Sequence, residues 1–231
     1  FNVVNLHLYH YAGNNPVKYT DPDGRCINFV IGAAAGFFTS VASEVGLRMA
    51  SGQSFGDALN NTFSDKTSLA VIATSTAIGA LTAGVSGAIV TNATKTATIQ
   101  IAKRGAVSAS KIIASNVAKT VAINTVSGAV DAGLKDVASK AIKGKKQSIS
   151  ETLQTMGKGA ASAFVTSGLT QAAIGSCSTS TSRVPNLLTG TVEGFEIQQP
   201  KWAGAAGVVG ESVIPTVIDM YHSLNQKSEF R

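Results

Sequence analysis

The fold of this chain is decided by two matching stretches, INFVIGAAAG at Ile27–Gly36 and INTVSGAVDAG at Ile123–Gly133. The match continues beyond them at an offset of about 96 residues. The further pairs are VASE with VASK (41–44 and 137–140), QSFGDAL with QSISETL (53–59 and 147–153) and AIG with AIG (77–79 and 173–175). Self-similarity at a fixed offset indicates a duplicated structural unit. We therefore expect two units within residues 26–182, at about 27–94 and 123–182, joined by a linker at 95–122.

Each unit is expected to contain a long helix, a short loop, an amphipathic helix and a second long helix. The amphipathic helices begin with capping-box spacings, in which Ser54 precedes Asp57 and Ser148 precedes Glu151. In a capping box the serine side chain bonds the backbone N–H three residues later, and the acidic residue reaches back. The chain is therefore predicted to be mainly α, with Gly/Ala-rich helical hairpins in an internal duplication and a small β-hairpin segment at the N-terminus.

The composition favours close backbone contact between helices over interlocking of large side chains. Only 14% of the residues are charged and 6% are aromatic, while 23 residues are glycine. Small residues spaced four apart, such as Gly32 and Gly36, let two helix backbones approach closely. The residues expected at helix contacts are Gly32, Gly36, Gly79, Gly128, Gly133 and Gly175.

Three uncharged runs raise the question of a membrane. They are Cys26–Ser43, Thr67–Thr94 and Gly159–Ser182. A helix needs about 20 residues to cross the hydrocarbon of a bilayer, so each run comes close to that length or meets it. The second run is rich in serine and threonine, and the third ends in SCSTSTS, so buried core helices are an equally open interpretation.

The positive charge is concentrated in the middle of the chain, which carries a net charge of +6 overall. Four lysines of the predicted linker, Lys95, Lys103, Lys111 and Lys119, recur every eight residues. That spacing rotates by about 80° per step around a helix, so the lysines form no single stripe. We expect a solvated basic face, with nucleic acid an unlikely partner because no aromatic stacking platform accompanies it.

The two ends differ in character from the helical region. Residues 2–11 and 17–19 are predicted strands, separated by the turn Gly13–Pro16 and closed by Asp21–Gly24. From residue 183 the chain is expected to form a loop-rich or extended linker, and then a terminal helix at 201–224 with an interruption at Pro215.

The first 25 residues resemble the end of the Rhs, or YD-repeat, associated core. The family pattern ends in an aromatic strand, a GNNP turn and a DPxG motif. The matching residues are Tyr9, His10 and Tyr11, then Gly13, Asn14, Asn15 and Pro16, then Asp21, Pro22, Asp23 and Gly24. Where the family ends this motif in leucine, the chain has Arg25.

This resemblance implies that the chain follows, and would be enclosed by, a β-shell of the same polypeptide. In the family the region after the motif is variable and is commonly a toxin delivered to competing cells, often countered by an immunity protein. The protein would be secreted or associated with the cell envelope, with its export signal upstream. Some members cleave themselves with aspartates from two DPxG copies, and Asp21 would be one of them. The second copy would lie before Phe1.

No catalytic constellation is visible in the sequence. We find no phosphate-binding loop, nucleophile elbow or metal-binding pattern, and we expect no metal and no cofactor. Cys26 and Cys177 are too few and too far apart for a disulfide framework and are expected to be buried. Asp219, Tyr221 and His222, together with Glu211, could be imagined as a site, but such residues on one terminal helix read better as its wet face.

Three functions remain open at this point. The first is action on the membrane of a target cell by insertion or pore formation. The second is a non-catalytic helical spacer between the Rhs core and an effector. The third is a nucleic-acid enzyme after Pro185 that the sequence does not reveal.

Overall fold

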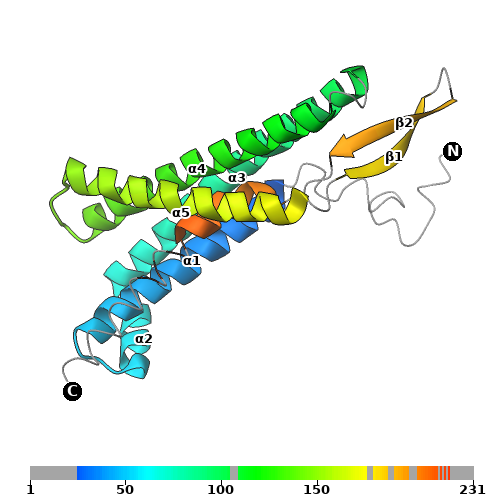
Figure 1. The fold of residues 1–231 in the computed structure, drawn as a ribbon. Coiled ribbons are helices and arrows are strands. Elements are labelled where there is room, and N and C mark those ends of the chain that lie inside the picture. The colour runs from blue at the N-terminus through cyan, green and yellow to red at the C-terminus, as the bar shows by residue number, and fades with distance from the viewer. Residues whose placement is uncertain are drawn as a thin grey trace, which may run out of the picture.

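The computed structural model describes residues 25–104, 109–175, 179–186, 190–197 and 202–212, together with Ile214, Thr216 and Ile218. The described part of the chain is mainly helical, which confirms the predicted class (Figure 1). The N-terminal β-hairpin predicted within residues 1–25 lies outside the described residues, apart from Arg25, which begins the first helix.

The first helical hairpin consists of α1 (Arg25–Ala50), the short α2 (Phe55–Ser64) and the long α3 (Lys66–Arg104). The chain turns after α1 at Gly52, whose φ of 101° favours glycine. Ser54 then caps α2, accepting the backbone N–H of Asp57 at 3.2 Å and donating its hydroxyl to the Asp57 carboxylate at 2.7 Å. These are the two residues of the predicted capping box.

Asp65 separates α2 from α3. Its carboxylate accepts the backbone N–H groups of Thr67 at 3.1 Å and Ser68 at 3.3 Å, which are donors in the first turn of α3. The Ser68 hydroxyl adds a hydrogen bond, and these contacts lower the pKa of the Asp65 carboxyl below its ordinary value. Asp65 therefore acts as the start signal of a new helix.

The second hairpin lacks this interruption. It consists of α4 (Ala109–Ile142) and a single continuous helix α5 (Ile149–Gly175), joined by a turn that contains Gly144 at a φ of 63°. The residue that aligns with Asp65 is Gly159, which has no side chain to accept backbone N–H groups. The prediction of a separate amphipathic helix in this unit was therefore wrong, and that segment forms the first turns of α5.

The predicted linker at 95–122 is also helical rather than separate. Residues 95–104 complete α3, and α4 begins at Ala109, so the two helices form the tip of a further hairpin. Ala97, Ile101 and Ile112 pack together at this tip. Apolar residues that recur every three or four positions give each helix a buried face. Both helices therefore continue through the basic segment.

Glycine sets the separation of the helices at each crossing. A Cβ atom built on Gly32 would collide with the Gly79 carbonyl of α3, and one built on Gly36 would collide with the Ser75 carbonyl. In the second hairpin a Cβ on Gly128 would collide with Ala163. The backbones of α1 and α3 therefore touch directly, whereas at Gly128 the α4 backbone meets the Ala163 methyl group of α5.

The other two expected contact residues occupy different places. Gly133 faces Met156, whose Cγ atom would lie 2.7 Å from an added Cβ. Gly175 ends α5.

The segment after α5 forms an antiparallel hairpin, where a loop-rich or extended linker was expected. β1 (Thr179–Asn186) pairs with β2 (Gly190–Ile197), with Thr179 opposite Ile197 and Asn186 opposite Gly190. Threonine and valine recur in both strands, and their branched side chains favour extended backbone. The extended character was expected correctly, but the pairing was not.

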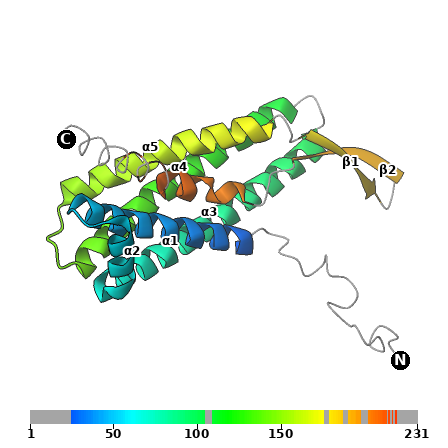
Figure 2. The ribbon, with the colours of Figure 1, turned by 90° about the horizontal axis from the view of Figure 1, so that it is seen from below.

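The C-terminal helical segment, residues 203–212, lies between the two hairpins (Figure 2). It begins with the 3₁₀ turn η4 (Ala203–Ala205), and residues 206–212 continue as helix. A Cβ on Gly204 would collide with Gly87 of α3, and one on Gly207 would collide with the Asn124 carbonyl of α4. Val208 is completely buried against Ala83. This segment is therefore the centre of the core.

A pair of α1 variants tests the role of glycine at the crossings. Gly32 contacts α3, whereas Gly46 has nothing within 4 Å of an added Cβ. We expect Gly46→Ala to raise the free energy of unfolding by about 1 kcal/mol, through helix propensity alone. Gly32→Ala should lower it by about 1–3 kcal/mol, because the overlap forces α1 and α3 apart. Urea denaturation followed by circular dichroism measures both. Effects of the same sign would contradict the role assigned to the crossing.

Candidate functional site

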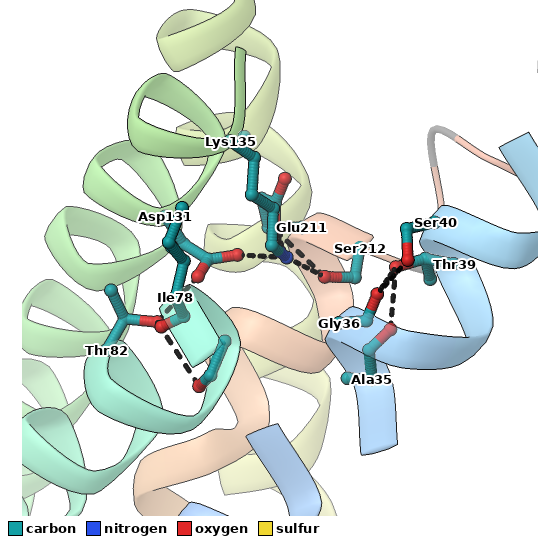
Figure 3. A network of polar contacts seen from close by, with 12 residues as sticks. Ala35, Gly36, Thr39, Ser40, Ile78, Thr82, Asp131, Lys135, Glu211 and Ser212 are labelled. Carbon is teal, nitrogen blue, oxygen red and sulfur yellow. Dashed lines mark hydrogen bonds and ion pairs between the residues drawn. The ribbon is translucent and has the colours of Figure 1, made fainter. Parts of the chain in front are cut away.

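A buried polar network joins the C-terminal helical segment to the second hairpin (Figure 3). Asp131 and Lys135 lie four residues apart on α4, so their side chains share a face and form an ion pair. The Lys135 ammonium contacts the Glu211 carboxyl at 3.3 Å and donates to the Ser212 hydroxyl at 2.8 Å. From α3, the Thr82 hydroxyl donates to Asp131 at 2.6 Å. Thus α3 and the C-terminal helical segment both contact the Asp131–Lys135 pair of α4.

Two carboxyl groups here share a single cation. Asp131 is 0% exposed, and Glu211 is nearly as deeply buried. Burial raises the pKa of Glu211 to about 8, and the hydrogen bond to Asp131 adds to the rise, although Lys135 opposes it. At neutral pH Glu211 is therefore largely protonated and acts as a donor to Asp131. The network then holds one buried anion and one buried cation, which is the arrangement that burial tolerates.

The Lys135–Ser212 contact has the length that a serine nucleophile and its lysine base would need, but not the chemistry. A base must accept the serine proton, whereas Lys135 is ion-paired with Asp131 and donates a hydrogen bond to the Ser212 hydroxyl. Ser212 is also buried and donates its own proton to Glu211 at 3.0 Å. The network therefore fastens the C-terminal helical segment to α4 and does not form a catalytic pair.

A cleft of about 380 Å³ adjoins the network, between α1, α4 and the C-terminal helical segment. Three of its four lysines, Lys135, Lys140 and Lys143, are engaged by acidic partners. Lys143 forms an ion pair with Glu44 of α1, and Lys140 contacts Asp136 and Glu151 at 3.0 Å each. Of these pairs, Glu44 with Lys143 crosses the cleft and ties the two hairpins together, whereas those of Lys140 lie within the second hairpin.

Two asparagines at equivalent positions of the repeat are completely buried, which the sequence analysis missed. Asn28 packs against Gly87, and the Asn124 amide donates to the Ser167 hydroxyl and the Ala203 carbonyl at 3.0 Å each. The signal was available, because the second letter of both matching stretches is asparagine. Asn124 fixes the start of the C-terminal helical segment.

Most of the motif and candidate site residues singled out in the sequence lie outside the described residues. They are Gly13, Asn14, Asn15, Pro16, Asp21, Pro22, Asp23 and Gly24, together with Cys177, Asp219 and His222. Glu211, which the sequence analysis grouped with Asp219 and His222, is described, and its side chain is buried rather than solvated. Cys26 is exposed, contrary to expectation, because it lies in the first turn of α1 before the helix reaches α3.

Within the described ranges, no three His, Cys, Asp or Glu side chains gather closely enough to hold a metal ion.

The outer surfaces of α1 and α3 are apolar. Residues 26–50 and 66–101 are each long and apolar enough to cross a membrane, and the most apolar windows are only 17% and 39% buried. Phe38 on α1 is 68% exposed, and Leu81 and Val85 on α3 are similarly exposed. A core helix of a soluble protein would bury such residues. In the described part of the chain these side chains are left exposed.

Comparisons of the chain with protein-family models, curated proteins and solved structures found no match. The relation to the Rhs family accordingly stays a prediction from the N-terminal motif.

The buried network makes the stability depend on pH. Folded Glu211 keeps a proton up to about pH 8 that the unfolded chain releases near its ordinary pKa of 4.5. Because the folded state binds more protons in this window, the free energy of unfolding should fall as pH rises through it. The slope should reach about 1.4 kcal/mol per pH unit.

Urea denaturation at a series of pH values tests this, with Glu211→Gln as the comparison. The amide keeps a donor for Asp131 but does not titrate, so the variant should lose the slope between pH 5 and 8. An equal slope in both proteins would show that another group carries the dependence.

Proposed function

We propose that this chain is the end of an Rhs-type core followed by the variable helical region of a polymorphic toxin, and that the helical region acts on membranes in competition between bacteria. In this proposal it has no catalytic role. The upstream Rhs shell encloses the chain before delivery to the target cell, and an immunity protein guards the producer. The GNNP and DPxG motifs support the family assignment, and the apolar face of the α1–α3 hairpin supports the action on membranes.

The observation that carries the proposal is the outward apolar face of the α1–α3 hairpin. Both helices have the length of a membrane span, yet only 17% and 39% of their most apolar windows are buried in the folded chain. Direct backbone contact at Gly32 and Gly79 is the type of packing that holds helix pairs together in lipid, where the hydrophobic effect no longer drives association. The hairpin can therefore enter a bilayer as one unit.

The duplication gives this hairpin a counterpart. Gly32 and Gly128 align in the repeat, and both lie at a crossing with the following long helix. Asn28 and Asn124 also align, and both are buried. The two long helices of each unit pair in different registers. The reason is that α2 is a separate helix in the first unit, whereas its counterpart forms the first turns of α5 in the second. We infer that one helical hairpin was duplicated and that the copies then diverged.

A helical spacer between the Rhs core and an effector is the second candidate. Contacts between separate elements favour it. Glu44 with Lys143 joins the two hairpins, and Lys135 with Glu211 fastens the C-terminal helical segment to α4. In that case the full chain would be a soluble helical monomer that leaves membranes intact.

Release of a trapped dye from phospholipid vesicles separates these functions, with matched phenylalanine variants. Phe38 on α1 is 68% exposed, and Phe164 on α5 is 57% exposed, so Asp should be accepted at either position in the folded monomer. A charge at the centre of a span costs about 3 kcal/mol or more. We expect Phe38→Asp to reduce dye release at least about tenfold and Phe164→Asp to leave it nearly unchanged.

Circular dichroism of both variants supplies the control for folding. Absence of dye release by the unmodified chain would favour the spacer. Equal loss in both variants would show that α1 has no special part.

A further inference from the structure

One side of the α3–α4 hairpin is a continuous groove whose character changes along its length. On α3 its lining residues recur every three or four positions and so share a side of the helix. They are Leu81, Val85, Ile89, Ala93, Thr96, Gln100 and Arg104. The matching series on α4 is Lys111, Ser115, Lys119, Ala122, Val126 and Val130. The groove thus runs from the base of the hairpin to its tip.

The half near the base is apolar. It encloses about 550 Å³ between residues 81–89 of α3 and 122–130 of α4. Its walls are aliphatic, and Val85 and Val126 are both more than half exposed. The opposite side of this gap is filled by Ala205 and the rest of the C-terminal helical segment. The open side is left without a partner within the described part of the chain.

The half near the tip is basic. It encloses about 450 Å³, and Arg104, Lys111 and Lys119 line it. No Asp or Glu occurs between residues 66 and 130, so neither wall of this half carries an acidic residue of its own. A concentrated positive charge attracts anionic groups.

A buried polar atom in the same hollow is left without a donor. Asn116 is 2% exposed, and its amide donates to the Thr94 hydroxyl at 3.3 Å. Its carbonyl oxygen finds no hydrogen-bond donor among the described residues. Leaving such an atom unpaired costs about 1–3 kcal/mol, so the site favours a ligand that brings a hydroxyl or amine donor.

We propose that this groove binds a single anionic phospholipid of the target membrane. An acyl chain would lie in the apolar half, the phosphate would meet Arg104, Lys111 and Lys119, and a headgroup or glycerol hydroxyl would donate to Asn116. The ligand class follows from the order of the two halves, because an amphiphile carries an anion next to a hydrocarbon chain. The inference rests on the proposed membrane function and names the lipid that the chain recognises first.

The test uses the full chain and a short-chain lipid, dihexanoylphosphatidylglycerol, below its critical micelle concentration. Isothermal titration calorimetry measures affinity without requiring insertion. We expect binding at least about tenfold tighter than to dihexanoylphosphatidylcholine, since each basic residue contributes about 1 kcal/mol toward an anionic lipid surface. Lys111→Glu combined with Lys119→Glu should weaken binding at least about tenfold.

The matched control is Lys145→Glu combined with Lys146→Glu, which makes the same charge change at two exposed lysines of the α4–α5 turn. It should alter the affinity by less than about twofold, because these lysines lie outside the groove. For the apolar half, Val126→Asn should weaken binding several-fold, and Leu153→Asn, at an exposed position of α5, should not.

The outcomes separate this inference from the membrane function. Binding with this pattern but without dye release would keep the lipid groove and remove the membrane function. Dye release without binding would keep the membrane function and remove the lipid groove. Equal affinity for the two lipids, or equal losses in the two lysine pairs, would overturn the groove.

Discussion

The structure depends on the close approach of helix backbones at glycine. With few large side chains, this chain gains little from interlocking of leucine and phenylalanine, and its helices come together where no Cβ stands between them. Gly32 against Gly79 sets the first hairpin, and Gly204 against Gly87 seats the C-terminal helical segment. Because contact at this range leaves no room for adjustment, each crossing has one register. Because such close contact leaves little space between the helices, the larger apolar side chains lie on the outside.

That outward placement connects the fold to the proposed activity. The polar atoms gather inside, at the Asp131–Lys135–Glu211 network and at the two buried asparagines, while Phe38 and Val85 face outward. A protein with a polar centre and apolar flanks has more to gain from a bilayer than one with the usual distribution. The Glu44–Lys143 ion pair then restrains the two hairpins, and Lys135 holds the C-terminal helical segment through Glu211 and Ser212.

The sequence predicted the features that depend on local patterns. The repeat, the Ser54 cap and the glycine spacing lie within a few residues or recur at one offset, so they could be read directly. The length of α5 depended on the absence of a capping side chain at Gly159, and the helical course of 95–104 depended on contacts with Ile112. Glu211 looked exposed because its partner Asp131 is 80 residues away along the chain. Burial of a polar residue depends on tertiary contacts, which local patterns do not show. The asparagine repeated at positions 28 and 124 was the sign of it in the sequence.

The most direct measurement is the depth of α1 in a bilayer. A spin label is attached at Phe38→Cys in a chain with Cys26→Ser and Cys177→Ser, and a second sample carries it at Phe164→Cys. On addition of anionic vesicles, the label at position 38 should lose contact with a water-soluble relaxation agent and gain contact with oxygen, whereas the label at position 164 should stay in water. If both labels remain in water, or if both enter the bilayer equally, the α1–α3 hairpin is not the inserting unit and the account is contradicted.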